Sequence, residues 1–260
     1  MKLKSNLLRY ITLIIELAVR DVKMRYKLSV LGIYWAVINP LLIALIYGFV
    51  FSEIFHAKGI SGVPYVAFIF TGVTFWNLFA NSLTSAVNSL TGNAVMLSKV
   101  SFPRVILPTS SVVARLVDFL FSLVVLIGIM IYYKLHFSLN MVAIVLLLIA
   151  ELIIALGLSY VFSALNVLYR DVAQILNIVL MLWVYLSPVF YTMQQIPAKY
   201  HSIYKYNPVG QLISQEVTLM LRGKLPDVYS IIYYMSISIV VLIVGYVIFK
   251  IIEPIFSEVM

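Results

Sequence analysis

The 260-residue chain contains no cysteine and few charged side chains. Only 11% of its residues are charged and 63% are hydrophobic, whereas a soluble domain has about 25% charged residues. Without cysteine, the chain can form no disulfide and can carry no thiolate chemistry. A chain of this length cannot hide so much apolar surface from water. The sequence therefore predicts an all-α integral membrane protein.

The sequence also lacks the motifs of a nucleotide-binding or catalytic protein. Gly223-Lys224 has no partner glycine at the spacing of a GxxxxGK[ST] phosphate loop. The three histidines, His56, His136 and His201, show no metal-ligand spacing. We find no paired carboxylates and no Ser/His/Asp arrangement. We therefore expect no catalytic residue, no metal site and no cofactor in this chain.

Basic residues predict how the chain is oriented in the membrane. Arg20, Lys23, Arg25 and Lys27 precede the first apolar run, and no further basic residue follows until Lys58. Such a cluster holds its side of the first span in the cytoplasm. A net charge of +8 would suggest nucleic acid in a soluble protein, but 12 of the 18 Lys and Arg fall on the predicted cytoplasmic side. We therefore expect contacts with membrane lipids, no nucleic acid, and both termini in the cytoplasm.

The apolar runs predict six transmembrane helices, because a helix needs about 20 apolar residues to cross the hydrocarbon core. The predicted spans are about 31–55, 63–83, 109–133, 141–168, 172–191 and 229–251. Asn39-Pro40 should kink the first span and Ser187-Pro188 should break the fifth. Residues 192–228 are too polar to span the membrane and too apolar for an ordinary loop. We expect re-entrant external helices there, before the last span.

Residues 1–29 predict an amphipathic helix at the cytoplasmic interface. At about 100° per residue, its main charged side chains fall within an arc of about 60°: Arg9, Glu16, Arg20, Lys23 and Lys27. Such a helix lies in the membrane interface with its charges towards the cytosol. Asp21 and Arg25 leave the pattern together, and we expect them to form an i,i+4 pair on the flank. The plainer interpretation is an anchor without a further role.

Ionisable residues inside predicted spans are candidate functional groups. Arg115 and Asp118 form an i,i+3 pair in the third span. Arg115 could meet a phosphate group on a substrate, or it could snorkel and pair with Asp118. Glu151 stands alone in the fourth span. We interpret it as a protonated packing residue and not as a proton relay, because a relay needs a chain of partners.

Aromatic residues make up 14% of the chain and gather on three predicted spans. They could form interface belts or core packing, or a wall against which sugar rings stack. Belts gather at two depths, yet Phe75 and Trp76 lie near the middle of the second span, which favours the wall. The candidate wall comprises Tyr47, Phe51, Phe75, Trp76, Trp183 and Tyr185.

Three motifs carry a resemblance to a known family. They are RDVKMRYKLSVLGIYWAVINPLL (residues 20–42), LSKVSFPRVILP (97–108) and LNVLYRDVAQILNIVLMLWVYLSPVFY (165–191). In this order and spacing, the chain resembles the membrane subunits of ABC-2 type transporters that export polysaccharides. Permeases for O antigen and lipopolysaccharide are the nearest branch, and capsule and teichoic-acid permeases are near relatives. The resemblance covers essentially the whole chain.

The resemblance implies a homodimer in the bacterial inner membrane, in which residues 30–260 form the ABC-2 transmembrane domain. Two copies of a separate cytosolic ATPase would bind ATP and Mg. The N-terminal helix and the loop between spans two and three would contact that ATPase. The residues implied in this coupling are Arg20, Asp21, Arg25, Ser98, Lys99, Phe102 and Arg104.

The resemblance further implies the substrate and its route. A polyprenyl-pyrophosphate-linked polysaccharide, O antigen first, would pass from the cytoplasm to the periplasm through a channel at the dimer interface. Spans one, two and five would line this channel, with Arg115 and the aromatic wall on the path. Alternatives are capsular or teichoic-acid export, an ATPase-independent channel or carrier, and an intramembrane enzyme. A channel or carrier would need several facing charges inside the membrane. An intramembrane enzyme would need a polar catalytic pair at one depth.

Overall fold

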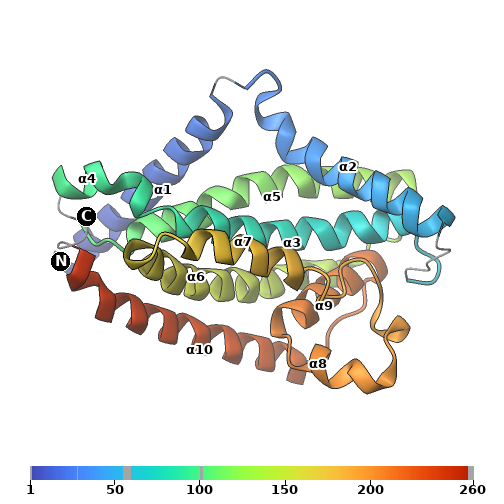
Figure 1. Ribbon diagram of the computed structural model, residues 1–260. Helices are drawn as coiled ribbons and strands as arrows, with labels where there is room; N and C mark the ends of the chain where they lie inside the picture. The colour runs from blue at the N-terminus through green and yellow to red at the C-terminus, as the bar shows by residue number, and fades with distance from the viewer. Residues whose placement is uncertain (1, 28, 55–59, 100–101, 257–260) are drawn as a thin grey trace.

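The computed structural model describes residues 2–27, 29–54, 60–99 and 102–256. These residues form an all-helical membrane protein (Figure 1), as the sequence predicts. Within them, five helical stretches are long and apolar enough to cross a membrane: Trp35–Ile54, Tyr65–Val87, Ile106–Tyr132, Leu139–Leu168 and Val228–Ile255. The predicted fifth span contains a shorter apolar helix, Val172–Trp183. Its crossing of the membrane stays a prediction.

Helix α1 (Lys2–Tyr26) and helix α2 (Trp35–Phe49) meet at a sharp bend near residues 29–34 (Figure 1). α1 packs against α5 (Ile106–Tyr132) through buried Leu17 and Ala18, while Leu8 on another face is exposed. α2 continues through Pro40 and ends in a π-helical turn, Val50–Ile54. The helix tolerates Pro40 although the ring removes one backbone donor.

Helix α3 (Tyr65–Val87) is the centre of the bundle. In its most apolar 18-residue window 83% of the residues are buried, against 17–33% in the other four spans, and it contacts α2, α5, α6, α7 and α9. Its buried hydroxyl groups bond to the carbonyl four residues earlier, as Thr71 does to Ala67 and Thr74 to Phe70, both at 2.7 Å. These groups therefore need no partner from a neighbouring helix.

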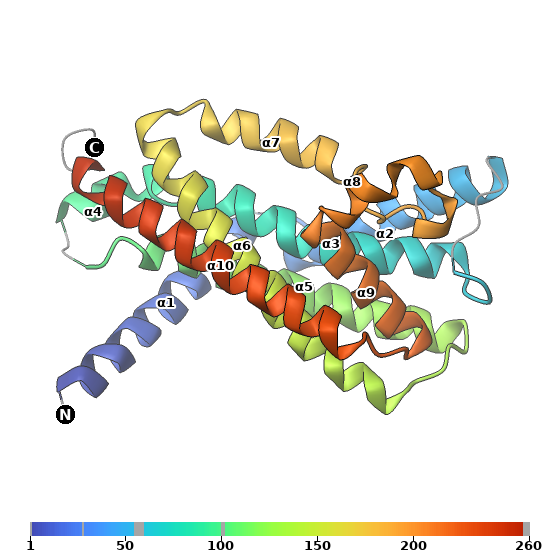
Figure 2. The same cartoon turned by 90° about the horizontal axis from the view of Figure 1, so that it is seen from below.

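Helices α6 (Ile144–Leu168, preceded by the 3₁₀ turn Leu139–Ala143) and α10 (Val228–Ile252) cross closely (Figure 2). Gly157 and Gly245 lie at the crossing, where a Cβ on Gly157 would come within 2.6 Å of the Val241 carbonyl oxygen. Small residues let two membrane helices bring their backbones together. The two glycines thus fix where α10 lies on α6.

One end of the bundle carries both termini and helix α4 (Ala94–Lys99), and we call it the termini end (Figure 1). Besides the main core around α3, a second apolar cluster lies there, and it includes buried Leu17, Leu107 and Phe249. The opposite end carries helix α8 (His201–Lys205) and helix α9 (Pro208–Arg222). Helix α7 (Val172–Trp183) runs between the two ends along α3 and α6. Its 12 residues give it a length of about 18 Å.

Candidate functional site

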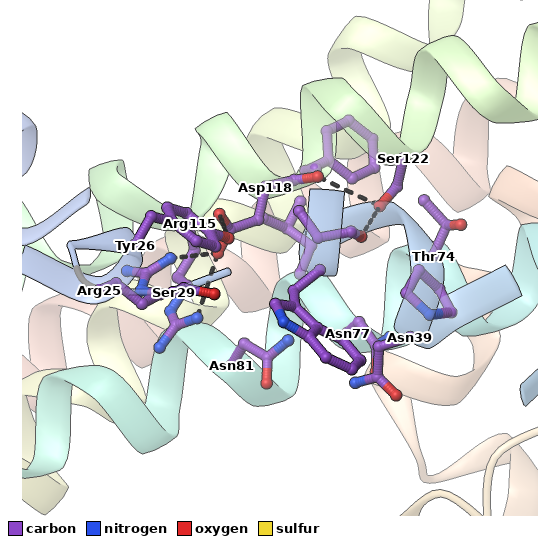
Figure 3. A pocket seen from close by; sticks show the side chains of 15 residues that line it. Arg25, Tyr26, Ser29, Asn39, Thr74, Asn77, Asn81, Arg115, Asp118 and Ser122 are labelled. Carbon is purple, nitrogen blue, oxygen red and sulfur yellow. Dashed lines mark hydrogen bonds and ion pairs between the residues drawn. The ribbon is translucent and has the colours of Figure 1, made fainter. Parts of the chain in front are cut away.

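A charged cluster joins the end of α1 to the middle of the bundle (Figure 3). Asp118 on α5 accepts hydrogen bonds from Arg25 and, at 2.7 Å, from the Tyr26 hydroxyl. Arg115, one turn earlier on α5, donates to Asp118 at 3.1 Å and to the Ser85 hydroxyl of α3 at 2.6 Å. The expected Arg115–Asp118 pair is therefore present. It belongs to a larger cluster that links α1, α3 and α5.

The protonation of Tyr26 favours this arrangement. Burial, followed by the hydrogen bond to Asp118, raises the pKa of Tyr26 to about 12. The hydroxyl therefore stays a donor at neutral pH. Two guanidinium groups and one hydroxyl thus share a single carboxylate, which leaves one net positive charge in the cluster.

A cavity of about 360 Å³ opens beside the charged cluster. Arg25 and Arg115 line one part of it, and the amides of Asn39, Asn77 and Asn81 line the wall formed by α2 and α3 (Figure 3). A second cavity, of about 400 Å³, shares Arg25 and Arg115 with the first. Guanidinium and amide groups can bind phosphate and sugar oxygens. The two arginines therefore lie between two polar cavities suited to such oxygens.

The two elements predicted to couple with an ATPase contact each other. Arg20 of α1 pairs with Asp21 at 3.0 Å and donates to the Asn93 side chain at 2.8 Å. The expected Asp21–Arg25 pair is wrong, because Asp21 binds its neighbour Arg20 and Arg25 binds Asp118. Asn93 directly precedes α4. α1 is thus attached to the segment between spans two and three.

The remaining coupling candidates lie around the loop after α4. Lys99 is exposed at the end of α4, whereas Phe102 packs against the second apolar cluster. Arg104 donates to the Glu253 carbonyl at 2.7 Å and lies over the Phe256 ring. The side chain of Ser98 and residues 100–101 fall outside the described part. The loop is therefore attached to the end of α10. The local sequence pattern does not predict this contact.

Four aromatic rings, from α2, the π-helical turn that follows it and the segment after α7, form a cluster centred on Phe190. The Phe190 ring lies 4.9 Å from Tyr47, 6.5 Å from Phe51 and 5.8 Å from Tyr185. Tyr185 is 51% exposed. We call these four residues the Phe190 cluster. Three of them are predicted wall residues, and the fourth, Phe190, follows the Ser187-Pro188 break.

The other wall candidates lie deeper in the bundle. Trp183 of α7 contacts Trp76 and Phe79 of α3, with ring centres 6.4 and 5.4 Å away. Phe75 packs against Phe119 of α5 and has no exposed surface. In the single chain, Phe75 therefore packs in the core and offers no face to a ligand. Trp76 is also buried.

Asn207 joins the end of α7 to the start of α9. Its Nδ2 donates to the Leu186 carbonyl and to the Ser187 hydroxyl, both at 3.0 Å. Its Oδ1 accepts from the Trp183 indole at 3.1 Å and from the Gly210 backbone at 3.0 Å. One side chain thus caps α9 and satisfies groups freed where α7 ends.

Glu151 is not alone, contrary to the sequence analysis. It is fully buried on α6 and lies within hydrogen-bonding reach of Glu216, fully buried on α9. Sequence analysis missed Glu216, although a local signal existed. Leu212, Ile213, Glu216 and Met220 recur at helical spacing, which places Glu216 within an apolar stripe.

Comparisons with known proteins agree with a transport role. The profile of the ABC-2 type transporter family matches residues 12–221. The O-antigen export system permease protein RfbA of Klebsiella pneumoniae is 34% identical over 100% of this chain and 99% of its own length. RfbA of Myxococcus xanthus is 30% identical over 93% of this chain and 92% of its own. The polysialic acid transport protein KpsM of Escherichia coli is 21% identical, covering 90% and 91%.

Proposed function

We propose, because the chain belongs to the ABC-2 type transporter family, that it is the permease of an ATP-driven polysaccharide exporter. The chain is a transport subunit and not an enzyme. The proposed substrate is a polyprenyl-pyrophosphate-linked O antigen. The observation that carries this choice is full-length similarity, at 34% and 30% identity, to permeases named for O-antigen export. Capsular polysaccharide or teichoic acid is the second candidate, supported by the 21% identity to a polysialic acid transporter.

The energy source in this proposal is a separate ABC ATPase. Two permease copies would bind two ATPase copies at the termini end, which we place in the cytoplasm of a bacterial inner membrane. Lys99 is exposed there for a direct contact. Arg20 and Asp21 would pass movement from α1 to the α4 segment, and Arg104 would pass it to α10. Arg25 would extend the route to Asp118.

We further propose a sixth crossing, which α7 begins and the following segment completes. α7 alone has a length of about 18 Å, against about 30 Å of hydrocarbon. The turns at residues 184–190 and the α9 helix would fill the remaining depth as re-entrant structure. Backbone groups at that depth need partners, and Asn207 supplies one to the Leu186 carbonyl while also donating to the Ser187 hydroxyl.

The proposed substrate path follows α2, α3 and α7. Arg25 and Arg115 would meet the pyrophosphate at the cytoplasmic entrance, because their cluster keeps one net positive charge beside a polar cavity. Sugar rings would then stack on the Phe190 cluster near the external end. Aromatic planes tolerate different sugars as they tolerate different bases. Trp76 and Trp183 would pack behind the residues that line the path, and Phe75 would hold α3 in place through its packing in the core.

Reconstitution of the permease with its ATPase tests the proposed function. We expect ATP hydrolysis to increase when the lipid-linked O antigen is added and to change little with the same glycan lacking its lipid. Hydrolysis that responds equally to a lipid-linked capsular glycan would favour the second candidate. Transport that proceeds without ATP or an ATPase would instead support the channel or carrier alternative.

Leucine variants of the aromatic residues test the path. We expect Tyr47→Leu, Phe51→Leu and Tyr185→Leu each to lower export several-fold, because leucine keeps apolar burial but loses the flat stacking face. Membrane abundance and basal ATP hydrolysis should stay near normal.

Phe75→Leu is the matched control, because the Phe75 ring packs in the core. It should lower abundance and export together, so that export per assembled permease is unchanged. Full export by all three path variants would remove the stacking role and leave these rings as packing residues.

A further inference from the structure

Two carboxyl groups meet in the apolar interior between α6 and α9. Glu151 is 1% exposed and Glu216 is 0% exposed. None of their four carboxyl oxygens receives a hydrogen bond from a donor among the described residues. Each carboxyl group lies within hydrogen-bonding reach of the other. Each carboxyl group is therefore the only polar partner that the described residues offer to the other.

In the described part of the chain, no cationic side chain interacts with the pair. Leu147 and Ile154 flank Glu151 on its own helix, and Leu212 and Val217 flank Glu216; all four are buried. The described residues contain no third His, Cys, Asp or Glu that would complete a metal site here. Two carboxylates alone do not supply the six to eight oxygen ligands that a cation such as Ca²⁺ takes.

The titratable groups on the elements that pack against α6 and α9 have other partners or are exposed. The Tyr65 hydroxyl of α3 donates to the Phe190 carbonyl, and the Tyr234 hydroxyl of α10 interacts with Gln215 and Ser230. Arg222, at the end of α9, donates to the Ser61 carbonyl. Lys134 and His136, before the 3₁₀ turn that leads into α6, are exposed. Among the described residues, the side chain that interacts with each of the two glutamates is the other glutamate.

Two adjacent negative charges without a cation cannot remain ionised in such a site. Burial of an unpaired carboxylate is very costly, and a group in this position takes up a proton instead. A second carboxylate beside it makes ionisation of both still less favourable. A protonated carboxyl group gains one O–H donor and keeps acceptor capacity. Protons therefore convert two repelling acceptors into two hydrogen-bonding partners.

We propose that Glu151 and Glu216 form a proton-binding site, a neutral carboxylic acid pair that fastens α9 to α6. Each O–H group donates to the carboxyl oxygen of the other residue. α9 is then held by Asn207 at its start, by this pair in its middle and by the contact of Arg222 with Ser61 at its end. Because Asn207 also binds the end of α7, the pair positions the external end of the path. That last consequence rests on the proposed function, whereas the protonation does not.

Infrared spectroscopy of the purified permease in nanodiscs tests the protonation. At neutral pH we expect the carbonyl stretch of a protonated carboxylic acid, which shifts in D₂O and is absent from Glu151→Gln/Glu216→Gln. Glu16→Gln, at an exposed position on α1, is the control and should leave the band unchanged. A wild-type spectrum without this band, or a band that persists in the double variant, would overturn the proposal.

Substitution of one partner tests the fastening. Glu151→Gln keeps an N–H donor towards Glu216, so it should stay within about twofold of wild type in protease resistance of the 192–206 segment. Glu151→Leu keeps the volume but removes the donor, and cleavage should be several-fold faster. Equal protection in both variants would overturn the fastening role. Normal protection with failed export would count against the proposed function only.

Discussion

Replacing Asp118 by Leu should give the largest loss of export among substitutions of the charged residues. The change removes the one carboxylate shared by Arg25, Arg115 and the Tyr26 hydroxyl. The two guanidinium groups then face each other in a site where the Asp118 side chain is 15% exposed. Breaking such a pair costs about 3 kcal/mol, near the lower end for buried pairs because some solvent reaches it. Membrane abundance, export and ATP hydrolysis should be measured together.

A double variant separates charge repulsion from the loss of the α1–α5 link. In Arg25→Met/Asp118→Leu one guanidinium is removed with the carboxylate, so the cluster returns to one net positive charge. We expect abundance to recover while export stays low, because no contact remains from Arg25 to α5. Glu16→Leu, an exposed change of the same charge on α1, should export normally. Normal abundance and export by the Asp118→Leu variant would show that the cluster is dispensable.

The five long spans could be predicted from sequence because the membrane leaves the chain little choice. Backbone groups in hydrocarbon must bond within their own segment, so an apolar run of sufficient length becomes a helix. The ends of the five spans lie within about four residues of the predicted ends. The fifth predicted span behaves differently. α7 ends at Trp183, ahead of Ser187-Pro188, and the polar side chain that completes the break, Asn207, lies 20 residues further along.

Pairings across the bundle could not be read from local spacing. An i,i+4 pair such as Asp21 with Arg25 is worth about 0.5 kcal/mol at most, so a better placed partner outcompetes it. Arg25 finds that partner in Asp118, 93 residues away. Glu216 could have been placed on an apolar stripe, but its partner Glu151 lies on another helix. The sequence indicates that an acidic residue within an apolar stripe is unusual. It does not identify the residue that this side chain contacts.

The direction of an apolar side chain is also hard to predict in a membrane protein. Lipid tails are as apolar as a protein core, so hydrophobicity does not separate inward-facing from outward-facing residues. The sequence predicts both Phe75 and Tyr185 as wall residues, and the mid-span position of Phe75 favours it of the two. In the structure Phe75 has no exposed surface, while Tyr185 is 51% exposed. Only the packing of α3 against α5 and α6 distinguishes them.

Adding one methyl group at Gly157 should remove most of the folded permease from the membrane. A Cβ there would lie 2.6 Å from the Val241 carbonyl oxygen and 2.7 Å from the Leu242 backbone nitrogen. Both atoms belong to the α10 backbone, so no side-chain rotation can relieve the contact. The α6–α10 crossing would have to widen, at a cost of about 3 kcal/mol, the upper part of the usual range for overpacking.

Gly128→Ala is the matched control, because it adds the same methyl group to a membrane helix where nothing lies within 4 Å of the new Cβ. Alanine also favours the helix by about 1 kcal/mol over glycine, so abundance and thermal stability should be equal to wild type or slightly higher. Gly245→Ala should behave like Gly157→Ala, since its Cβ would meet the Gly157 carbonyl group. Abundance by immunoblot and the melting temperature of the purified protein give the comparison. Equal behaviour of the Gly157 and Gly128 variants would show that α10 can move away from α6 without cost, and that the two glycines do not fix the crossing.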